Sequence, residues 1–240
     1  DILCAGFPCQ TFSICGKKEG FNDKVKGNLF FKILEIVDIK KPNTLILENV
    51  KNLYSIDNGE VFNRIKDEIE KKGYKFNFKI INSKYYNSPQ SRERIYIICN
   101  KNNLYKFKEI KNKIIPVSSI IDTSFTHFLD YESKYKLEKC KNSKTMLYKL
   151  INKQSGKGGR QGERVYSINN CGPTICASSG GPGSKTGLYE INNKIRTLNV
   201  KETLQMFGFD KLFKYDSLEN KNKMLYYLGN SIVVNVLEEL

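Results

Sequence analysis

Apolar and polar residues alternate with two different periods over the first hundred residues of the chain. Short apolar runs predict strand-like segments, and apolar residues at helical spacing predict helices. The strand-like segments are expected at 2–5, 44–47, 74–81 and 95–99, and the helices at 29–39 and 60–72. This β-α-β-α order predicts an α/β fold with a parallel sheet and helices on its faces.

The texture of the sequence changes at Lys101, after which lysine, asparagine and serine dominate and few clean periods remain. Residues 156–186 are rich in glycine, and recurring apolar residues among them favour short strands joined by glycine loops over a flexible linker. The last segment, 224–240, is typical of an apolar helix that returns to the first domain. We therefore expect one domain of residues 1–100 completed by 222–240, and a mainly β and irregular domain of residues 101–221.

The composition indicates a globular protein. The chain has 240 residues, of which 40% are hydrophobic, enough to bury a core. It contains no apolar run of membrane-spanning length and no recognisable leader, so we expect a cytoplasmic protein of bacterial type. Its seven cysteines are poorly spaced for disulfides or for zinc, so reduced thiols and no metal are expected.

The net charge of +15 favours a polyanionic partner. Lysine enrichment alone is a weak signal in a chain that is also rich in asparagine and isoleucine. The arginines are more informative, because five of the six lie in motif-like segments and the guanidinium fork suits phosphate and base recognition. Nucleic acid is therefore a better candidate partner than a membrane.

Four polar motifs lie directly beside the predicted strands and near the end of the chain. They are Gly6-Phe7-Pro8-Cys9-Gln10, Glu48-Asn49-Val50, Gln90-Ser91-Arg92-Glu93-Arg94 and Gly229-Asn230-Ser231-Ile232-Val233. In this order they resemble the motifs of the DNA (cytosine-5) methyltransferase family. The resemblance implies a Rossmann-like, S-adenosylmethionine-dependent methyltransferase sheet in the first domain and a target-recognition role for the second.

The resemblance also implies the residues of the catalytic site. Carbon 5 of cytosine is a poor nucleophile until a thiolate adds to carbon 6, and Cys9 matches the family's nucleophile. Glu48 matches the acid that faces ring nitrogen 3, and Arg92 and Arg94 match the pair that contacts the base carbonyl. S-adenosylmethionine is the implied cofactor. Its expected contacts are Pro8, Leu29, Asn230 and Ser231.

Duplex DNA is the implied partner, with the target base flipped out of the helix. The polar stretch 15–27 matches the loop that fills the gap left by the base. Arg164 is suited to read a guanine edge. The expected DNA contacts are Gln10, Ser13, Cys15, Gln90, Gln161, Arg164, Gly180 and Gly181.

The recognition region is most similar to bacterial modification methylases that recognise GCGC. Three residues depart from that pattern: Arg160 is inserted before Gln161, and Ser179 and Pro182 differ in the second glycine-rich loop. The exact target sequence therefore remains open.

Two alternatives share these motifs. One is the branch of the family that methylates transfer RNA, and the other is a non-catalytic DNA-binding half of a split methylase. The family's Phe-x-Gly-x-Gly cofactor motif is expected several tens of residues before Cys9, but only eight residues precede it. We therefore expect a portion of a longer enzyme, or a chain completed by an N-terminal polypeptide. A papain-like Cys/His site is disfavoured, because the single histidine, His127, lies in the irregular region.

Overall fold

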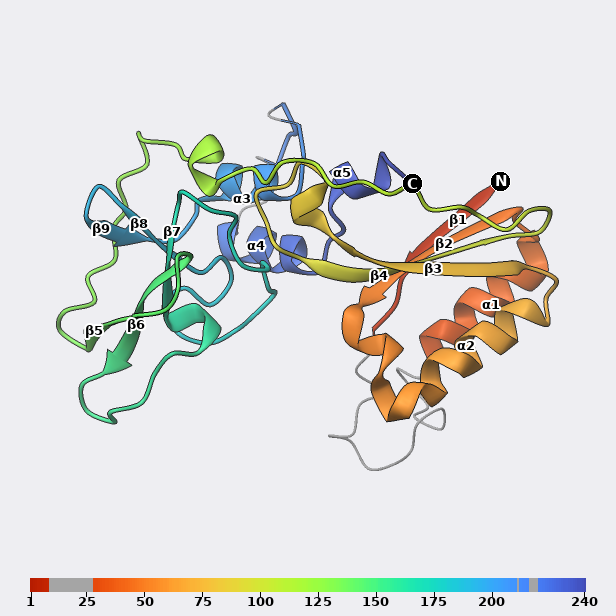
Figure 1. Cartoon of the computed structure of the whole chain (residues 1–240), viewed down its shortest axis with the longest axis horizontal. Coiled ribbons are helices and arrows are strands. Elements are labelled where there is room, and N and C mark those ends of the chain that lie inside the picture. Colours follow the sequence, from red (N-terminus) through yellow and green to blue (C-terminus); the bar gives the residue numbers. More distant parts are fainter. Residues whose placement is uncertain (9–27, 211, 216–219) are drawn as a thin grey trace. The chain divides into compact units, whose positions relative to one another are not determined.

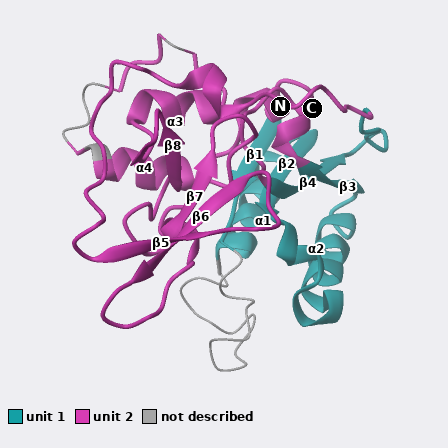
Figure 2. Cartoon of the chain, turned by 60° about the vertical axis from the view of Figure 1, so that its left-hand side comes forward, with its two compact units in different colours: residues 1–81, 93–108 teal, residues 82–92, 109–240 magenta. Residues whose placement is uncertain are grey.

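The computed structural model describes residues 1–8, 28–210, 212–215 and 220–240. The chain divides into two compact units (Figure 2). Unit 1 comprises residues 1–81 and 93–108, and unit 2 comprises residues 82–92 and 109–240.

In its described residues unit 1 contains a four-stranded sheet in the order β1-β2-β4-β3, with two α-helices. Its strands are β1 (Ile2–Gly6), β2 (Thr44–Val50), β3 (Lys75–Asn82) and β4 (Glu93–Asn100), and its helices are α1 (Asn28–Lys40) and α2 (Glu60–Glu70). Two short 3-10 helices, Lys51–Tyr54 and Ile56–Gly59, connect β2 to α2. Each predicted element of this region is present within a few residues of its expected bounds.

Helices α1 and α2 cover one face of this sheet (Figure 1), and the core lies between them and the strands. Along β2 every second residue is buried, so Leu45 and Leu47 point into the core while Glu48 lies on the other face. Helix α2 buries Ile65 and Ile69, which are four residues apart and share one face. The face opposite the two helices is therefore where β2 can present a functional carboxylate.

The sheet is mixed, so the prediction of a parallel sheet was wrong in part. Strands β1 and β2 are parallel, but β4 runs antiparallel to β2, with Val50 opposite Arg94. Parallel neighbours need a long crossover, usually a helix. The link from β3 to β4, residues 83–92, contains only the short 3-10 helix Ser83–Tyr85 and turns. This link therefore contains the first residues of the polar motif, Gln90 to Arg92, and no crossover helix.

Unit 2 is built on a second sheet, in the order β5-β6-β7-β8-β9. Its strands are β5 (Tyr135–Lys139), β6 (Met146–Asn152), β7 (Arg164–Ser167), β8 (Leu188–Ile191) and β9 (Lys194–Arg196). The helices of unit 2 are α3 (Val200–Met206), α4 (Lys221–Gly229) and α5 (Val234–Leu237), with 3-10 turns at Val117–Ile120 and Gln161–Glu163. Leu150, Val165, Leu188 and Ile195 form a small core on this sheet. The region that looked irregular is therefore an ordered, mainly β unit.

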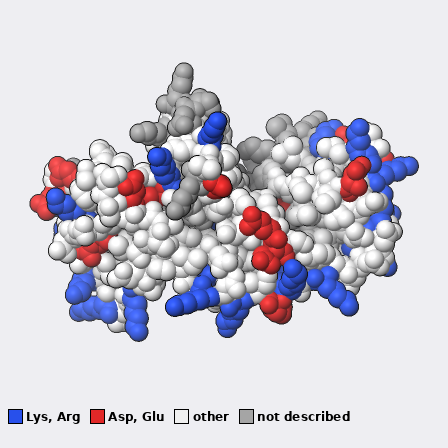
Figure 3. All heavy atoms as spheres, turned by 90° about the horizontal axis from the view of Figure 1, so that it is seen from above, with Lys and Arg blue, Asp and Glu red and all other residues white. Residues whose placement is uncertain are grey.

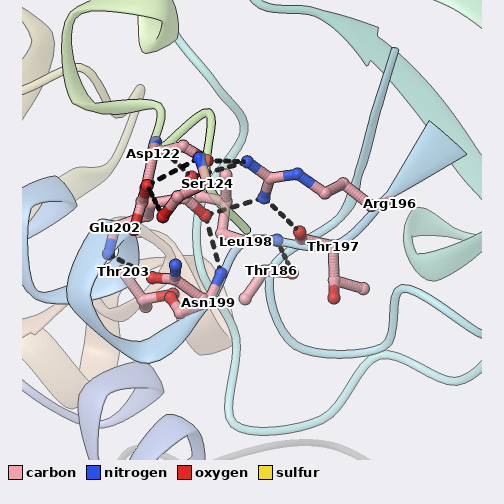
Figure 4. Close-up of polar contacts among 9 residues, drawn as sticks. All are labelled: Asp122, Ser124, Thr186, Arg196, Thr197, Leu198, Asn199, Glu202 and Thr203. Atoms are coloured by element: carbon pink, nitrogen blue, oxygen red, sulfur yellow. Dashed lines mark hydrogen bonds and ion pairs between the residues drawn. The ribbon is translucent and has the colours of Figure 1, made fainter. Parts of the chain in front are cut away.

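A buried ion pair fixes the turn between β9 and α3 (Figure 4). Both carboxylate oxygens of Glu202 accept from the Arg196 guanidinium, at 2.7 and 2.8 Å, and the two side chains are 0% and 1% exposed. Glu202 also accepts from the backbone N–H of Asn199 and of Asp122. The Asn199 side chain in turn accepts from the Glu202 N–H, a reciprocal cap of α3. One carboxylate thus joins three segments of unit 2.

The end of the chain differs from the single helix that we expected. Helices α4 and α5 are separated by residues 230–233. A side chain on Gly229 would meet the Ala177 backbone nitrogen at 2.2 Å, so the chain passes too close to its neighbour there for any other residue. Residues 222–240 lie in the second compact unit. Their assignment to the catalytic domain stays a prediction.

Candidate active site

The polar site of unit 1 begins where two parallel strands end side by side. Gly6, at the end of β1, lies opposite Glu48 of β2. The side-chain amide of Asn49 donates to the carbonyl of Phe7 at 2.7 Å, and Asn49 is buried. This bond holds the residues that lead to Pro8 beside the end of β2. Carboxyl ends of parallel strands are the usual binding edge of an α/β sheet.

The predicted residues Cys9, Gln10, Ser13 and Cys15 lie outside the described residues. Pro8 is exposed at the end of the described β1 segment. Leu29, near the start of α1, is also exposed, although the neighbouring Phe30 is buried in the core. Both are therefore accessible to a ligand.

Glu48 and Arg94 form the ion pair of this edge. Arg94 Nε lies 3.1 Å from Glu48 Oε1, and the two side chains are 15% and 13% exposed. The register explains the pair. Glu48 lies opposite Tyr96 and Arg94 lies opposite Val50, so the two charged residues are diagonal neighbours on one face of the sheet. The Arg94 guanidinium also donates to the carbonyl of Glu93 at 2.8 Å, which restricts its orientation.

Arg92 does not share this environment, although only one residue separates it from Arg94. It belongs to unit 2, where it is 3% exposed. Its guanidinium donates to the carbonyls of Ile175, Gly229 and Ser231 at 2.8, 3.2 and 2.9 Å. It also lies over the ring of Phe207, 5.3 Å from the centroid. Arg92 therefore holds backbone segments together, and a direct contact with a base has no support in these bonds.

Gln90 is likewise buried. Its side-chain nitrogen donates to the carbonyl of Met206 at 3.2 Å, and its side-chain oxygen accepts from the N–H of Ile175 at 2.9 Å. The residue is 0% exposed. A contact with DNA would require Gln90 to leave this position, so the observed role of Gln90 is to join segments of unit 2.

The late motif forms the turn between α4 and α5. The Asn230 side chain donates to the carbonyl of Tyr226 at 3.1 Å and is exposed. Ser231 is partly buried, and its carbonyl is one of the three that Arg92 binds. Arg92 thus donates to carbonyls on both sides of Asn230, at Gly229 and Ser231, and holds the backbone of this turn.

The two glycine-rich segments lie against each other in unit 2. The N–H of Gly183 donates to the carbonyl of Gly162 at 2.8 Å. A side chain on Gly162 would come within 2.0 Å of the Gly180 carbonyl oxygen. Gly180 and Gly181 both have positive φ, at 68° and 80°, which favours glycine. Close backbone packing therefore explains both segments.

Two of the predicted DNA contacts project from the first of these segments. Gln161 donates to the carbonyl of Thr174 at 2.6 Å. Arg164 Nε donates to the carbonyl of Gly159 at 2.8 Å, and the side chain is half-buried. Arg164 also forms a side-chain hydrogen bond with Tyr166. A guanidinium has five N–H donors, so Arg164 keeps donors for base reading beyond these two bonds.

Sequence reasoning missed two of the charged pairs. Glu163, 2% exposed, accepts from Arg160 Nη2 at 2.5 Å and from the Arg160 N–H at 3.1 Å. The hydrogen bond from Arg160 lowers the pKa of Glu163. The other pair is Arg196 with Glu202, and the Asn199-x-x-Glu202 spacing could have indicated it as a capping box.

On the face shown in Figure 3 the lysine and arginine side chains are scattered, with acidic side chains between them, so charge does not mark a binding surface on this face. In the described residues no group of three or more His, Cys, Asp or Glu is arranged to hold a metal ion. No helix in the described ranges is long and apolar enough to cross a membrane.

Comparisons with known proteins extend over the whole sequence. The family model for C-5 cytosine-specific DNA methylases matches residues 1–240. The type II methyltransferase M.HhaI of Haemophilus parahaemolyticus is 37% identical over 249 residues, which cover 99% of this chain and 73% of that protein. The type II methyltransferase M.HaeII of Haemophilus aegyptius is 35% identical over 248 residues, 100% of this chain and 72% of that protein.

Two solved structures share the fold. The Entamoeba histolytica methyltransferase EhMeth matches with a TM-score of 0.75 at 17% identity, covering 99% of this chain and 74% of that chain. The S. pombe Dnmt2 methyltransferase matches with a TM-score of 0.69 at 16% identity, covering 99% of this chain and 76% of that chain. The predicted α/β methyltransferase fold is confirmed.

Proposed function

The chain belongs to the C-5 cytosine-specific DNA methylase family, and on this premise we propose how its residues act and on which target. It is a DNA cytosine-5 methyltransferase, related to the modification enzymes of type II systems. We propose that it methylates cytosine in a specific duplex sequence similar to GCGC. The cytoplasm of a bacterium as its place of action stays a prediction.

The pair of Glu48 and Arg94 at the end of β2 carries the proposal. It combines a hydrogen-bonding carboxyl group with a fixed cation on a partly buried edge, beside the strand that leads to Cys9. Such a pair suits the Watson–Crick edge of a cytosine flipped from the duplex. Glu48 would face ring nitrogen 3, and Arg94 would stabilise charge at the neighbouring carbonyl oxygen.

Cys9, in the motif shared with the family, would be the nucleophile. Its thiolate adds to carbon 6 of the base, and the electron pair of the 5,6 double bond becomes available at carbon 5. A proton held by Glu48 at nitrogen 3 offsets the charge that this addition places on the ring. After carbon 5 has been methylated, a base removes its hydrogen and the thiolate leaves. Arg92 would act only as a positioning residue.

S-adenosylmethionine is the proposed cofactor, with Pro8, Leu29, Asn230 and Ser231 as its proposed contacts. In unit 1, Pro8 and Leu29 are apolar and exposed. In unit 2, Asn230 is exposed and Ser231 is partly buried on the same turn. S-adenosylmethionine would supply the methyl group. These side chains would bind and orient it.

Target recognition would belong to unit 2. Arg164 and Gln161 would contact base edges, and the tight approach of the loops at Gly180 and Gly181 would let backbone approach the DNA. Gln10, Ser13 and Cys15 would contact the DNA around the flipped base. The comparisons give no support to a complementing N-terminal polypeptide.

Covalent trapping tests the proposal. Duplex DNA carrying 5-fluorocytosine in GCGC should form a stable adduct with the protein in the presence of S-adenosylmethionine, because fluorine at carbon 5 cannot be removed as a proton. Cys9→Ser should abolish the adduct, while Cys4→Ser, on exposed Cys4 of β1, should retain it. An adduct that survives in Cys9→Ser would contradict the assignment. Methyl transfer to transfer RNA but not to the duplex would favour the RNA-modifying alternative.

A further inference from the structure

An open cavity of about 510 Å³ lies at the surface of unit 2, beside residues 155–163. It is bounded by the start of β5, the end of β6 and the chain from 155 to 163. Its lining includes Lys134, Tyr135, Asn152, Lys157, Arg160 and Glu163.

The charges that line this cavity are mainly positive. Lys134, Lys157 and Arg160 contribute three cations, against the single carboxylate of Glu163. That carboxylate is already occupied by Arg160, its partner at 2.5 Å. Neither lysine forms an ion pair with any residue that the structure describes. Both lysines are exposed, and Lys134 Nζ lies 5.9 Å from the centroid of the Tyr135 ring. Their positive charge is therefore available to an anionic ligand.

The backbone that carries Lys157 and Arg160 is held in place, although their side chains are exposed. The N–H of Asn152 donates to the carbonyl of Lys157 at 2.9 Å, closing the turn after β6. A side chain at Gly158 would lie 2.0 Å from the carbonyl oxygen of Leu150, so the chain after Lys157 is pressed against β6. Glu163, 2% exposed, binds Arg160 through both its guanidinium and its N–H. This bond uses Nη2 of Arg160, so the other N–H groups of its guanidinium can bind a ligand.

We propose that this cavity binds phosphate groups of the DNA backbone, through Lys134, Lys157 and Arg160. The proposal rests on the proposed function, because it takes duplex DNA as the partner of unit 2. Arg164, the proposed base reader, is hydrogen-bonded to Gly159, which lies between two of these cations along the chain. A duplex that reaches Arg164 would therefore bring its phosphates near the cavity. Lysines act on phosphates as point charges, which adds affinity without reading sequence.

The test compares two double variants that remove the same charge. Lys134→Ala with Lys157→Ala removes both lysines of the cavity. Lys136→Ala with Lys139→Ala removes two exposed lysines of β5 that do not line it. Affinity for a GCGC duplex and for a scrambled duplex is measured over a range of salt concentrations. The cavity variant should lower the slope of log affinity against log salt by about 1.8, since each phosphate contact contributes about 0.9.

The loss of affinity should be the same on both duplexes, and the control variant should change the slope by less than half as much. Equal slopes for the two double variants would overturn the proposal, because the lysines would then act only through net charge. It would also be overturned if ATP, titrated calorimetrically, bound the wild type but not the cavity variant while the slope stayed unchanged. The cavity would then serve a free nucleotide.

The proposed function is judged separately, by methyl transfer to the GCGC duplex. A wild type that binds the scrambled duplex but methylates none would contradict that function. The salt slopes of the two double variants would still decide whether the cavity binds phosphate.

Discussion

Replacing Arg92 by methionine should lower the free energy of unfolding much more than the equivalent change at Arg94. Arg92 is 3% exposed and donates three hydrogen bonds to backbone carbonyls that are distant in sequence. Methionine has a similar length and stays apolar, so it preserves most of the packing against Phe207 but none of the hydrogen bonds.

The size of the effect follows from those bonds. A hydrogen bond to a charged group contributes about 1.5–3 kcal/mol, so three bonds at the lower bound give about 4.5 kcal/mol. Better burial of an apolar side chain offsets part of this, and we expect a net loss of about 3–4 kcal/mol in the free energy of unfolding. Domains are stable by only about 5–15 kcal/mol, so such a loss is easily measured.

The assay is urea denaturation followed by circular dichroism. Arg94→Met is the control, because it removes one ion pair and one bond to the adjacent Glu93 carbonyl, instead of three bonds to distant segments, and should therefore cost clearly less than Arg92→Met. Methyl transfer should show the opposite order, with Arg94→Met losing more turnover per folded molecule.

Arg92→Lys provides a second measurement if the methionine variant does not fold. It keeps the charge but not the fork, so the turn at Asn230 should loosen and the KM for S-adenosylmethionine should rise more than kcat falls. An unfolding midpoint of Arg92→Met equal to that of the wild type would show that the three bonds of Arg92 do not stabilise unit 2. Losses of stability in Arg94→Met as large as those in Arg92→Met would show the same.

Three further predictions concern the other sites. Glu48→Gln should lower turnover about 100- to 10,000-fold with little change in DNA affinity, whereas Glu93→Gln, which alters an exposed carboxylate, should leave turnover unchanged. Gly162→Ala should abolish selective binding of the GCGC duplex, because its Cβ would lie 2.0 Å from the carbonyl oxygen of Gly180. The control is Gly156→Ala, whose Cβ would have nothing within 4 Å. Its left-handed backbone should lower the free energy of unfolding by only about 1–2 kcal/mol, and selectivity should be retained. The pKa of Glu163 is lowered in the folded protein, so its pair with Arg160 stabilises the fold at pH values above the ordinary pKa of glutamate. This stability is lost as the pH falls through the lowered pKa. The difference in unfolding free energy between wild type and Glu163→Gln should therefore shrink on acidification, and a difference that stays constant with pH would contradict the pair.

The order of strands and helices in unit 1 could be read from the sequence. Apolar periodicity is local, and it placed α1 at 29–39 and β2 at 44–47, close to the observed Asn28–Lys40 and Thr44–Val50. The family could also be recognised, because its motifs are short and contiguous. Glu48 and Arg94 were selected on that basis, and the structure brings the two together.

The direction of β4 could not be read in the same way. Strand direction depends on which strand β4 pairs with and on how the chain returns to it, and both are long-range properties. The break between α4 and α5 is similar, because it depends on the close approach of Gly229 to residues about fifty positions earlier.

The positions of Gln90, Arg92 and Arg94 could not be predicted from the sequence either. They lie in one motif, and a sequence pattern treats them alike. In the structure Gln90 and Arg92 are buried against carbonyls and an N–H from residues 175–231, while Arg94 meets a carboxylate on the neighbouring strand. A side chain's role depends on the partners that satisfy its donors and acceptors, and burial makes those partners obligatory. These partners come from distant parts of the chain, so only folding brings them together.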